Sequence, residues 1–120
     1  MGSYKDLEVF RKAYKLSMEI FELSKSFPPE EKFSLTDQIR RSSRSVCANF
    51  GEAYRRRKYP AHFVSKLTDC DAENTETEVW IMFAFSCKYI SQVQFKEFSD
   101  KVAEIGRMLG SIISNPEKYL

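Results

Sequence analysis

The regular spacing of apolar residues is the feature that most constrains how this chain folds. Near the start, apolar residues alternate in steps of four and three: Val9, Ala13, Leu16, Ile20 and Leu23. Because an α-helix turns once in about 3.6 residues, this spacing places all five on one helix face. Comparable spacing recurs further along, so the sequence predicts four amphipathic helices, over about residues 4–26, 35–57, 60–90 and 92–114. Larger side chains beside the first stripe widen its core-facing surface: Leu7, Phe10, Tyr14 and Phe21.

Proline and capping residues mark where these helices are expected to begin and end. Pro28 and Pro29 close the first segment, Pro60 suits the first turn of the third, and Pro116 ends the last. A Ser followed three residues later by an acid or an amide is typical of a helix start. This pattern occurs three times, as Ser3 with Asp6, Ser34 with Asp37, and Ser91 with Gln94.

Chain length and turn residues narrow the fold class further. The 120 residues suffice for one domain, and only 4 Gly and 4 Pro are available to make turns. A β-sandwich or a β-barrel needs many more turns than that. We therefore predict one all-α domain over residues 1–120, an up-and-down four-helix bundle.

Few residues of the kinds that build catalytic or metal sites are present. The three cysteines, Cys47, Cys70 and Cys87, lie far apart without a C-x-x-C pair, which excludes a zinc ribbon and a thioredoxin-type site. His62 is the only histidine, which disfavours histidine-based metal sites and catalytic triads. We accordingly expect no catalytic residue, no metal and no cofactor, and therefore a protein that is not an enzyme.

No segment suggests a membrane or a secretory destination. The longest unbroken apolar run, residues 79–85, is far too short to cross a bilayer. No apolar stretch of a signal peptide follows the N-terminus. We expect a soluble cytoplasmic protein without a membrane partner.

A small net charge of +2 conceals two segments of opposite sign. Segment 40–58 holds seven basic residues against one acid, a local charge of +6, and the helical wheel places its basic stripe opposite the core. Basic residues gathered on an outward face suit the binding of phosphates or of an acidic partner. The alternative is an ordinary solvated helix face. The candidate nucleic-acid-binding residues are Arg40, Arg41, Arg44, Arg55, Arg56, Arg57 and Lys58.

The next segment along the chain is acidic. Between residues 69 and 78 stand five acids and no base, which are Asp69, Asp71, Glu73, Glu76 and Glu78. Glu73 and Glu76 resemble part of the carboxylate sets that hold Mg²⁺ in all-helical nucleotide pyrophosphatases, but no second carboxylate motif follows. We favour an acidic patch that docks on the basic patch of the next subunit in a ring.

A polar stripe borders the apolar face of the second predicted helix, formed by Gln38, Arg41, Ser45, Asn49 and Glu52. At this position the side chains can hydrogen-bond across the seam between two helices. Arg41 is expected to reach a carboxylate on a neighbouring helix, with Glu52 as a second pairing point. We interpret the stripe as a structural network rather than a catalytic site, because no activated nucleophile or base accompanies it.

Residues 79–85 are apolar on every side of the third predicted helix. One bundle core covers only one side, so the others need a second cover. A partner subunit is the favoured cover, and the alternatives are long neighbouring side chains or the C-terminal pair Tyr119 and Leu120. The residues expected at an oligomer interface are Val79, Trp80, Met82 and Phe83.

Several strings resemble the signature of a bacterial four-helix-bundle family encoded by intervening sequences of large-subunit ribosomal RNA genes. They are Tyr4-Lys5-Asp6-Leu7-Glu8-Val9-Phe10-Arg11-Lys12-Ala13, Phe27-Pro28, Leu35-Thr36-Asp37-Gln38-Ile39-Arg40-Arg41, Ser45-Val46 and Asn49-Phe50-Gly51-Glu52. The family usually has Ile-Ala-Glu-Gly at 50–53, where this chain has Phe-Gly-Glu-Ala, and often Pro at position 47.

This family is similar to the accessory variability protein of diversity-generating retroelements. The similarity implies a barrel-shaped pentamer whose basic surface binds nucleic acid and a reverse transcriptase, with Arg40, Arg41 and Arg44 as the matching basic positions. We therefore predict a non-catalytic, oligomeric protein that binds RNA or DNA. One alternative is a protein-interaction adaptor whose charged stripes are used in subunit or partner contacts. Another is a Mg²⁺-dependent nucleotide hydrolase, in which Glu73 and Glu76 would converge with further carboxylates.

Overall fold

Four α-helices account for most of the computed structural model, which describes residues 2–120. They are α1 (Glu8–Ser24), α2 (Leu35–Arg55), α3 (Pro60–Ser86) and α4 (Gln92–Ser114). Three short 3₁₀ turns stand before, between and after them: η1 (Tyr4–Asp6), η2 (Pro29–Glu31) and η3 (Pro116–Tyr119). No strand occurs in the described residues, and the predicted all-α class is confirmed.

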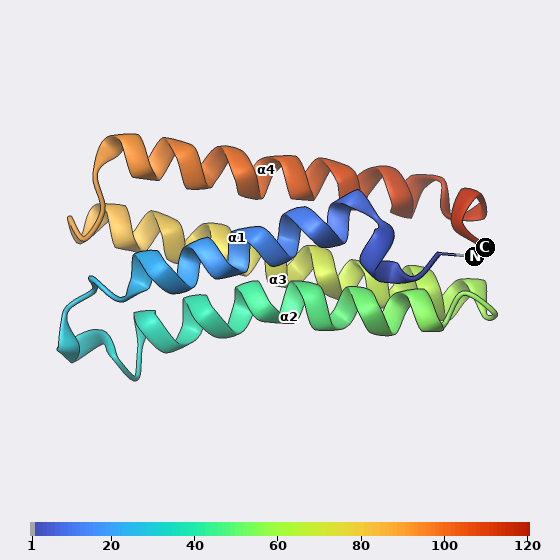
Figure 1. Ribbon diagram of the computed structural model, residues 1–120, viewed down its shortest axis with the longest axis horizontal. Coiled ribbons are helices and arrows are strands. Elements are labelled where there is room, and N and C mark those ends of the chain that lie inside the picture. The colour runs from blue at the N-terminus through green and yellow to red at the C-terminus, as the bar shows by residue number, and fades with distance from the viewer. Residues whose placement is uncertain (1) are drawn as a thin grey trace.

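The helices run up and down in sequence order as a four-helix bundle (Figure 1). Each helix packs on the next, and α1 closes the bundle against α4, within an envelope of 44 × 25 × 21 Å. Both termini lie at the end that holds the α2–α3 turn, while the α1–α2 and α3–α4 loops share the other end (Figure 1). Among residues 2–120 no helix is both long and apolar enough to span a membrane.

The core forms along the faces that the apolar spacing predicts. Of the first stripe, Val9, Ala13, Leu16 and Ile20 are buried and Leu23 is half-buried. The largest wholly buried aliphatic side chains come from all four helices: Ile20, Ile39, Leu67, Ile81, Ile105 and Leu109. Their burial supplies the main driving force for the bundle.

Several buried polar side chains inside the bundle are paired with one another or with the backbone, whereas the buried Trp80 Nε1 has no partner among the described residues. The hydroxyls of Ser42 and Thr77 lie 2.8 Å apart across the α2–α3 contact. Asn74 donates from Nδ2 to the Val102 carbonyl oxygen at 3.0 Å and so joins α3 to α4. Pairing removes the cost of burying these groups, and it fixes the register of neighbouring helices.

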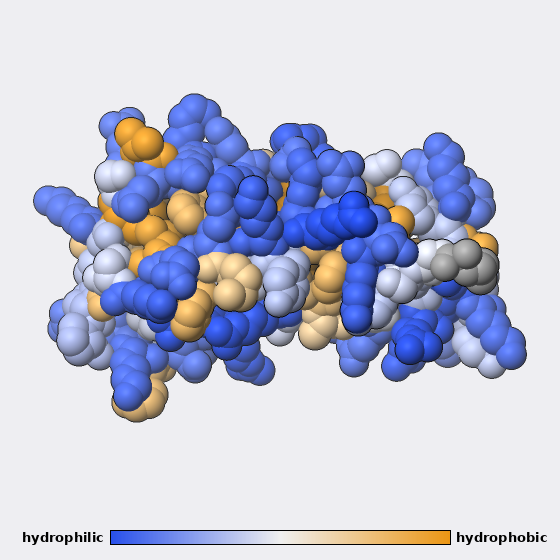
Figure 2. Space-filling view, in the orientation of Figure 1, coloured by the Kyte–Doolittle hydropathy of each residue, from blue (hydrophilic) through white to orange (hydrophobic). Residues whose placement is uncertain are grey.

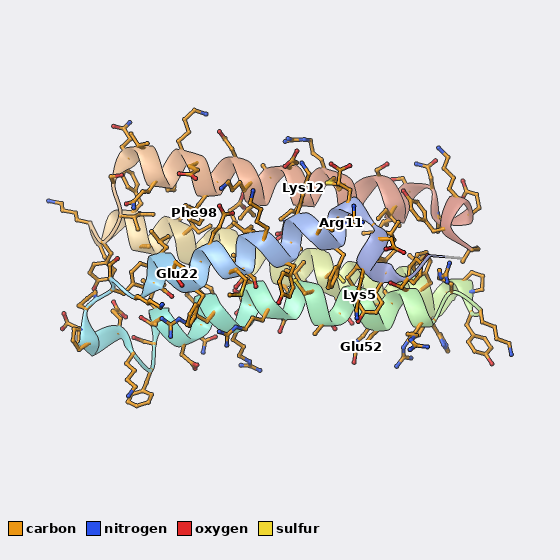
Figure 3. The ribbon with its side chains drawn as sticks, viewed as in Figure 1. Lys5, Arg11, Lys12, Glu22, Glu52 and Phe98 are labelled. Carbon is orange, nitrogen blue, oxygen red and sulfur yellow. The ribbon has the colours of Figure 1, made fainter. Side chains whose placement is uncertain are left out.

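Ion pairs on the surface join α1 to α4. Lys12 Nζ lies 2.9 Å from Glu104 Oε2, and Figure 3 shows Lys12 between the two helices. Further along the same pair of helices, Lys101 Nζ lies 2.8 Å from Glu19 Oε2.

The first predicted helix begins later than expected. The capping pair Ser3 and Asp6 forms, but it caps η1, and α1 starts only at Glu8. Leu7 separates the two elements because its backbone is extended, with φ −79° and ψ 137°. The capping pair Ser91 and Gln94, in contrast, stands at the start of α4 as predicted.

Helix α2 starts at Leu35 as predicted, but with a different cap, and α3 ends earlier than predicted. Ser34 makes no side-chain cap for α2; instead Glu31 Oε1 accepts a hydrogen bond from the Leu35 N–H at 3.3 Å. Helix α3 ends at Ser86 rather than near residue 90, because Lys88 adopts a left-handed backbone conformation with φ 65°. A left-handed residue just past the last turn is a common helix stop.

Candidate nucleic-acid interface

The seven basic side chains of segment 40–58 extend from the first half of α2 to the turn that follows it. Within the part of the chain that the structure describes, none of the seven forms an ion pair with a carboxylate. Arg40 and Arg57 are half-buried, whereas five are exposed: Arg41, Arg44, Arg55, Arg56 and Lys58. The helical wheel placed Arg40, Arg44, Arg55 and Lys58 outward. Of these four, Arg44, Arg55 and Lys58 are exposed as predicted, and Arg40 is not.

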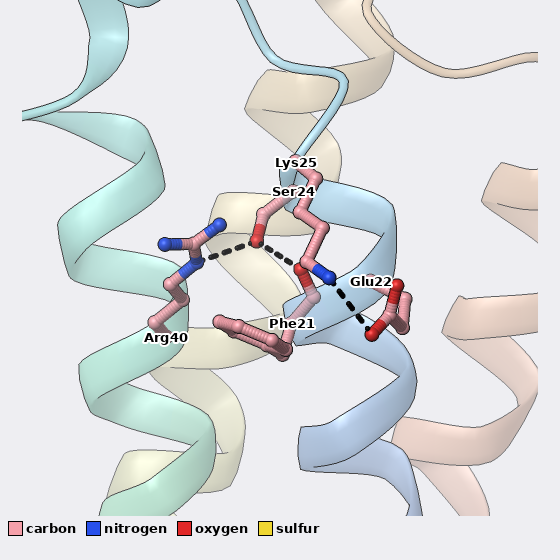
Figure 4. A network of polar contacts seen from close by, with 5 residues as sticks. All are labelled: Phe21, Glu22, Ser24, Lys25 and Arg40. Atoms are coloured by element: carbon pink, nitrogen blue, oxygen red, sulfur yellow. Dashed lines mark hydrogen bonds and ion pairs between the residues drawn. The ribbon is translucent and has the colours of Figure 1, made fainter.

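Arg40 lies against α1 instead of in solvent (Figure 4). Its Nε donates to Ser24 Oγ at 2.7 Å, and its guanidinium carbon lies 4.8 Å from the centre of the Phe21 ring. The wheel misplaced Arg40 because it assumes one buried face, whereas α2 packs on both α1 and α3. Arg40 is thus mainly a packing residue, and the predicted outward role needs this correction.

Arg57 ties the end of α2 to the C-terminal segment. Its Nε donates to the Tyr54 carbonyl oxygen at 2.9 Å, and one of its terminal nitrogens, Nη1, donates to the Tyr119 carbonyl oxygen at 3.1 Å. The guanidinium carbon also lies 3.5 Å from the centre of the Tyr54 ring. These three contacts occupy Arg57 within the chain.

The polar stripe on α2 forms one link to α3. Glu52 projects from α2 (Figure 3), and its Oε2 lies 3.2 Å from Lys66 Nζ, so Glu52 is the pairing point across the seam. Asn49 instead donates to the Ser45 carbonyl oxygen of its own helix at 3.0 Å. Arg41 stays exposed and forms no ion pair with any residue from 2 to 120, although its charge acts on the Glu73 carboxyl of α3. Gln38 is half-buried beside Trp80.

The acidic run lies along α3. Burial raises the pKa of Glu73, and the neighbouring Glu76 carboxylate raises it further, while the positive charge of Arg41 opposes both effects. Among residues 2–120, no group of three or more His, Cys, Asp or Glu side chains is placed to hold a metal ion. The further carboxylates that the hydrolase hypothesis requires beside Glu73 and Glu76 are therefore not found in the described residues.

A hollow lies between α1 and α2, on a face that is otherwise largely hydrophilic (Figure 2). Aromatic rings of Tyr4, Phe10 and Tyr14 line one side, and Arg44 and Arg55 line the other. The sequence pattern suggested that Phe10 and Tyr14 widen the core, yet Tyr14 is 56% exposed. Only their place at the edge of the apolar stripe signalled this surface role.

The small residues Ala48 and Gly51 form the α2 side of this hollow. A Cβ atom on Gly51 would lie 3.6 Å from the Tyr4 ring, so Tyr4 packs in ordinary contact distance of the α2 backbone. Tyr4 in turn meets Phe10 edge to face, with 5.0 Å between the ring centres. Packing therefore fixes the position of the Tyr4 ring at the edge of the hollow.

The predicted oligomer residues form an exposed apolar patch near the C-terminal end of α3. Val79, Met82 and Phe83 are 38%, 51% and 53% exposed, and Trp80 is half-buried. Tyr119 and Leu120, the alternative cover, lie at the opposite end of the bundle (Figure 1). Residues 2–120 leave the patch uncovered.

Comparison with known families decides the relationship of the chain. Residues 5–111 match the family model described as 23S rRNA-intervening sequence protein. The chain belongs to this family. The predicted family resemblance is thereby confirmed, whereas the further relationship to retroelement accessory proteins remains a prediction.

A solved structure agrees with this assignment. It is the crystal structure of a protein of unknown function from the S23 ribosomal protein family of Bacteroides thetaiotaomicron. The two chains are 33% identical, with a TM-score of 0.80 over 88% of this chain and 97% of that one. No curated protein matches the chain.

Proposed function

We propose that this 23S rRNA-intervening sequence protein is a non-catalytic homo-oligomer that binds nucleic acid through the outer face of α2. One observation carries the proposal: Arg41, Arg44, Arg55, Arg56 and Lys58 are exposed, and none has a carboxylate partner among the described residues. Cations without internal partners are available to neutralise phosphates. RNA is the first candidate ligand, because the family is named for a ribosomal RNA gene insertion. On the same ground we place the protein in the cytoplasm.

Binding by this face is electrostatic. Each Arg or Lys that neutralises a phosphate releases condensed counterions, so affinity falls as salt concentration rises. Phosphate contacts carry little information about base sequence. With five contacts, we expect the logarithm of the association constant to fall with the logarithm of salt concentration at a slope of about −3.5 for a single strand and about −4.5 for a duplex.

The apolar patch on α3 supports the oligomeric part of the proposal. Exposed apolar groups of this size are uncommon on monomers, and a second copy of the chain would cover them. A pentamer is the form that the resemblance to retroelement accessory proteins implies. The same resemblance makes a reverse transcriptase or another protein a proposed partner.

A salt titration with a charge-reversal variant tests nucleic-acid binding. Fluorescence anisotropy of a labelled RNA should show tight binding at low salt, weakened between about 50 and 200 mM by about 100-fold for a single strand and about 500-fold for a duplex. Reversing four of the five exposed cations should lower the affinity by on the order of 100-fold or more without unfolding the bundle. The variant is Arg41→Glu, Arg44→Glu, Arg55→Glu and Lys58→Glu.

A matched control separates the location of charge from its amount. It reverses four exposed cations elsewhere, as Lys15→Glu, Lys96→Glu, Arg107→Glu and Lys118→Glu. This control should retain most of the affinity. Equal losses in both variants would mean that only net charge matters, and no binding by the wild type at low salt would refute the proposal.

A second candidate function is a protein-interaction adaptor. The opposite charges of α2 and of the acidic run on α3 favour it, since they would complement each other between subunits. In that case the α2 charge reversal would change the oligomer mass at low salt, and RNA binding would be absent from the wild type.

A further inference from the structure

Two hollows join into one track along α2. The first is the hollow between α1 and α2, and the second lies over the start of α2, where Phe33, Arg40 and Arg41 line it. Arg44 and Ala48 line both. We name the stacking track by the side chains that matter for binding: Phe33, Arg41, Arg44, Tyr14, Tyr4 and Arg55.

Aromatic rings in the track are unusually open to solvent. Phe33 is 84% exposed and Tyr14 is 56% exposed. Positions this exposed are usually occupied by polar residues. Phe33 also has Lys32 Nζ 5.3 Å from its ring centre, so a cation stands next to the ring. Open rings beside cations are the combination that single-stranded nucleic acids bind, because bases stack while phosphates pair.

The length of the track suits several unpaired nucleotides. Arg41 and Arg55 stand fourteen residues apart on α2, which corresponds to about 21 Å of helix. The rings of Tyr14 and Tyr4 lie along this length, across from the cations. Bases in a duplex are stacked on one another and cannot place their faces on these rings, whereas unpaired bases can.

Acidic side chains interfere little with the track. Of the residues lining the two hollows, Asp37 and Glu52 are the acids, and Glu52 is already paired with Lys66 at 3.2 Å. The net charge of the side chains along the track is therefore positive.

We propose that the stacking track binds single-stranded nucleic acid. Arg41, Arg44 and Arg55 contact phosphates spaced along the strand, and Tyr14 and Phe33 stack on bases. This inference rests on the proposed function and narrows its ligand from nucleic acid in general to unpaired strands.

Paired probes of equal length test the inference. Anisotropy is measured with labelled twelve-nucleotide oligouridine and with a twelve-base-pair RNA duplex at the same salt. Tyr14→Ala and Phe33→Ala should each weaken binding of the single strand about 5-fold or more, the lower end of the loss per stacked base. Binding of the duplex and the salt slope should stay unchanged.

Conservative variants control for folding and for loss of volume. Tyr14→Phe keeps the ring and should bind like the wild type, whereas Tyr14→Leu keeps apolar volume without the ring and should bind like Tyr14→Ala. The far-ultraviolet circular dichroism of each variant shows whether the helices remain. Arg44→Glu should weaken binding of both probes.

The outcomes separate this inference from the proposed function. No binding of either probe by the wild type refutes both. Equal affinity for both probes, or unchanged affinity in the ring variants, overturns only the stacking track and leaves phosphate binding in place. If polyglutamate competes as well as oligouridine and the ring variants are unaffected, the face binds an acidic protein, and the inference is also overturned.

Discussion

Arginine serves two purposes within a single helix of this protein. Arg40 packs on Phe21 and hydrogen-bonds Ser24, while Arg41 is exposed. Arg44 is also exposed, although its guanidinium carbon lies 5.6 Å from the centre of the Phe21 ring. A guanidinium stacks on a ring and donates in a fixed plane, so it can be held by neutral partners as well as by phosphates. An arginine of this helix can therefore serve in packing within the chain or remain available to a ligand, and the two roles fall on different residues.

Truncation of Arg40 should destabilise the fold. We expect Arg40→Ala to lower the free energy of unfolding by about 1–2 kcal/mol, because a charge-assisted hydrogen bond and a ring contact are lost. Arg41→Ala should change it by less than about 0.5 kcal/mol, as for most exposed substitutions. Urea denaturation measures both. Equal stability of the two variants would show that the Ser24 contact contributes nothing.

The three cysteines should differ in reactivity. Burial raises the pKa of Cys47 to about 11 and that of Cys70 to about 12, while Cys87 is exposed. At pH 8 the Cys47 thiolate is then about one part in a thousand, and the thiolate is the reactive form. Titration with a thiol reagent should show one fast group in the native protein and three after denaturation. Cys87→Ser should remove the fast group.

At the scale of elements, Glu31 of η2 connects three parts of the chain. Its carboxylate accepts hydrogen bonds from the Ser34 hydroxyl, from the Tyr89 hydroxyl at 2.8 Å and from the Leu35 N–H. One side chain thus caps α2 and fastens the α1–α2 loop to the α3–α4 loop. The hydrogen bonds from Ser34, Tyr89 and Leu35 lower the pKa of Glu31, in that order of importance.

Acid should release this connection. A lowered pKa means that Glu31 stabilises the fold above about pH 4.5, its ordinary value, and that this contribution is lost as pH falls through the folded-state pKa. We expect wild type to exceed Glu31→Gln in urea midpoint at pH 7, with the difference shrinking toward pH 3. Other carboxylates titrate in both proteins and cancel. A difference independent of pH would contradict this role.

At the scale of the whole molecule, the apolar patch on α3 is a surface that the fold of a single chain does not bury. Each helix buries one face in the bundle, and only α3 has an apolar run that passes all the way round. The family match extends over residues 5–111, so the patch lies well within the shared fold.

Charges placed in the patch should prevent self-association. We expect the wild type to have a light-scattering mass several times the 14.1 kDa of one chain, and Met82→Glu with Phe83→Glu to have the mass of one chain. Val93→Glu, on α4 at 77% exposure, is the control and should leave the oligomer intact. A monomeric wild type would refute the oligomer.

The apolar spacing and the proline and capping residues by themselves determined the fold class and the number and order of the helices. Helix formation and helix ends follow from local geometry, which the sequence encodes directly. Val9, Ala13, Leu16 and Ile20 lie on the face that their spacing requires, and Ser91 with Gln94 begins α4 as predicted. Boundaries set by backbone conformation, such as the left-handed Lys88, carry no periodic signal and were misplaced.

Only the tertiary structure decided which basic side chains have partners within the chain and which aromatic rings are exposed. Arg40 and Arg57 have partners on segments distant in sequence, Ser24 and Tyr119, and no pattern within segment 40–58 encodes these neighbours. Tyr14 likewise faces a hollow because α1 and α2 meet beside it. A helical wheel describes a single helix. Whether a side chain has a partner or is exposed depends on how several helices pack together.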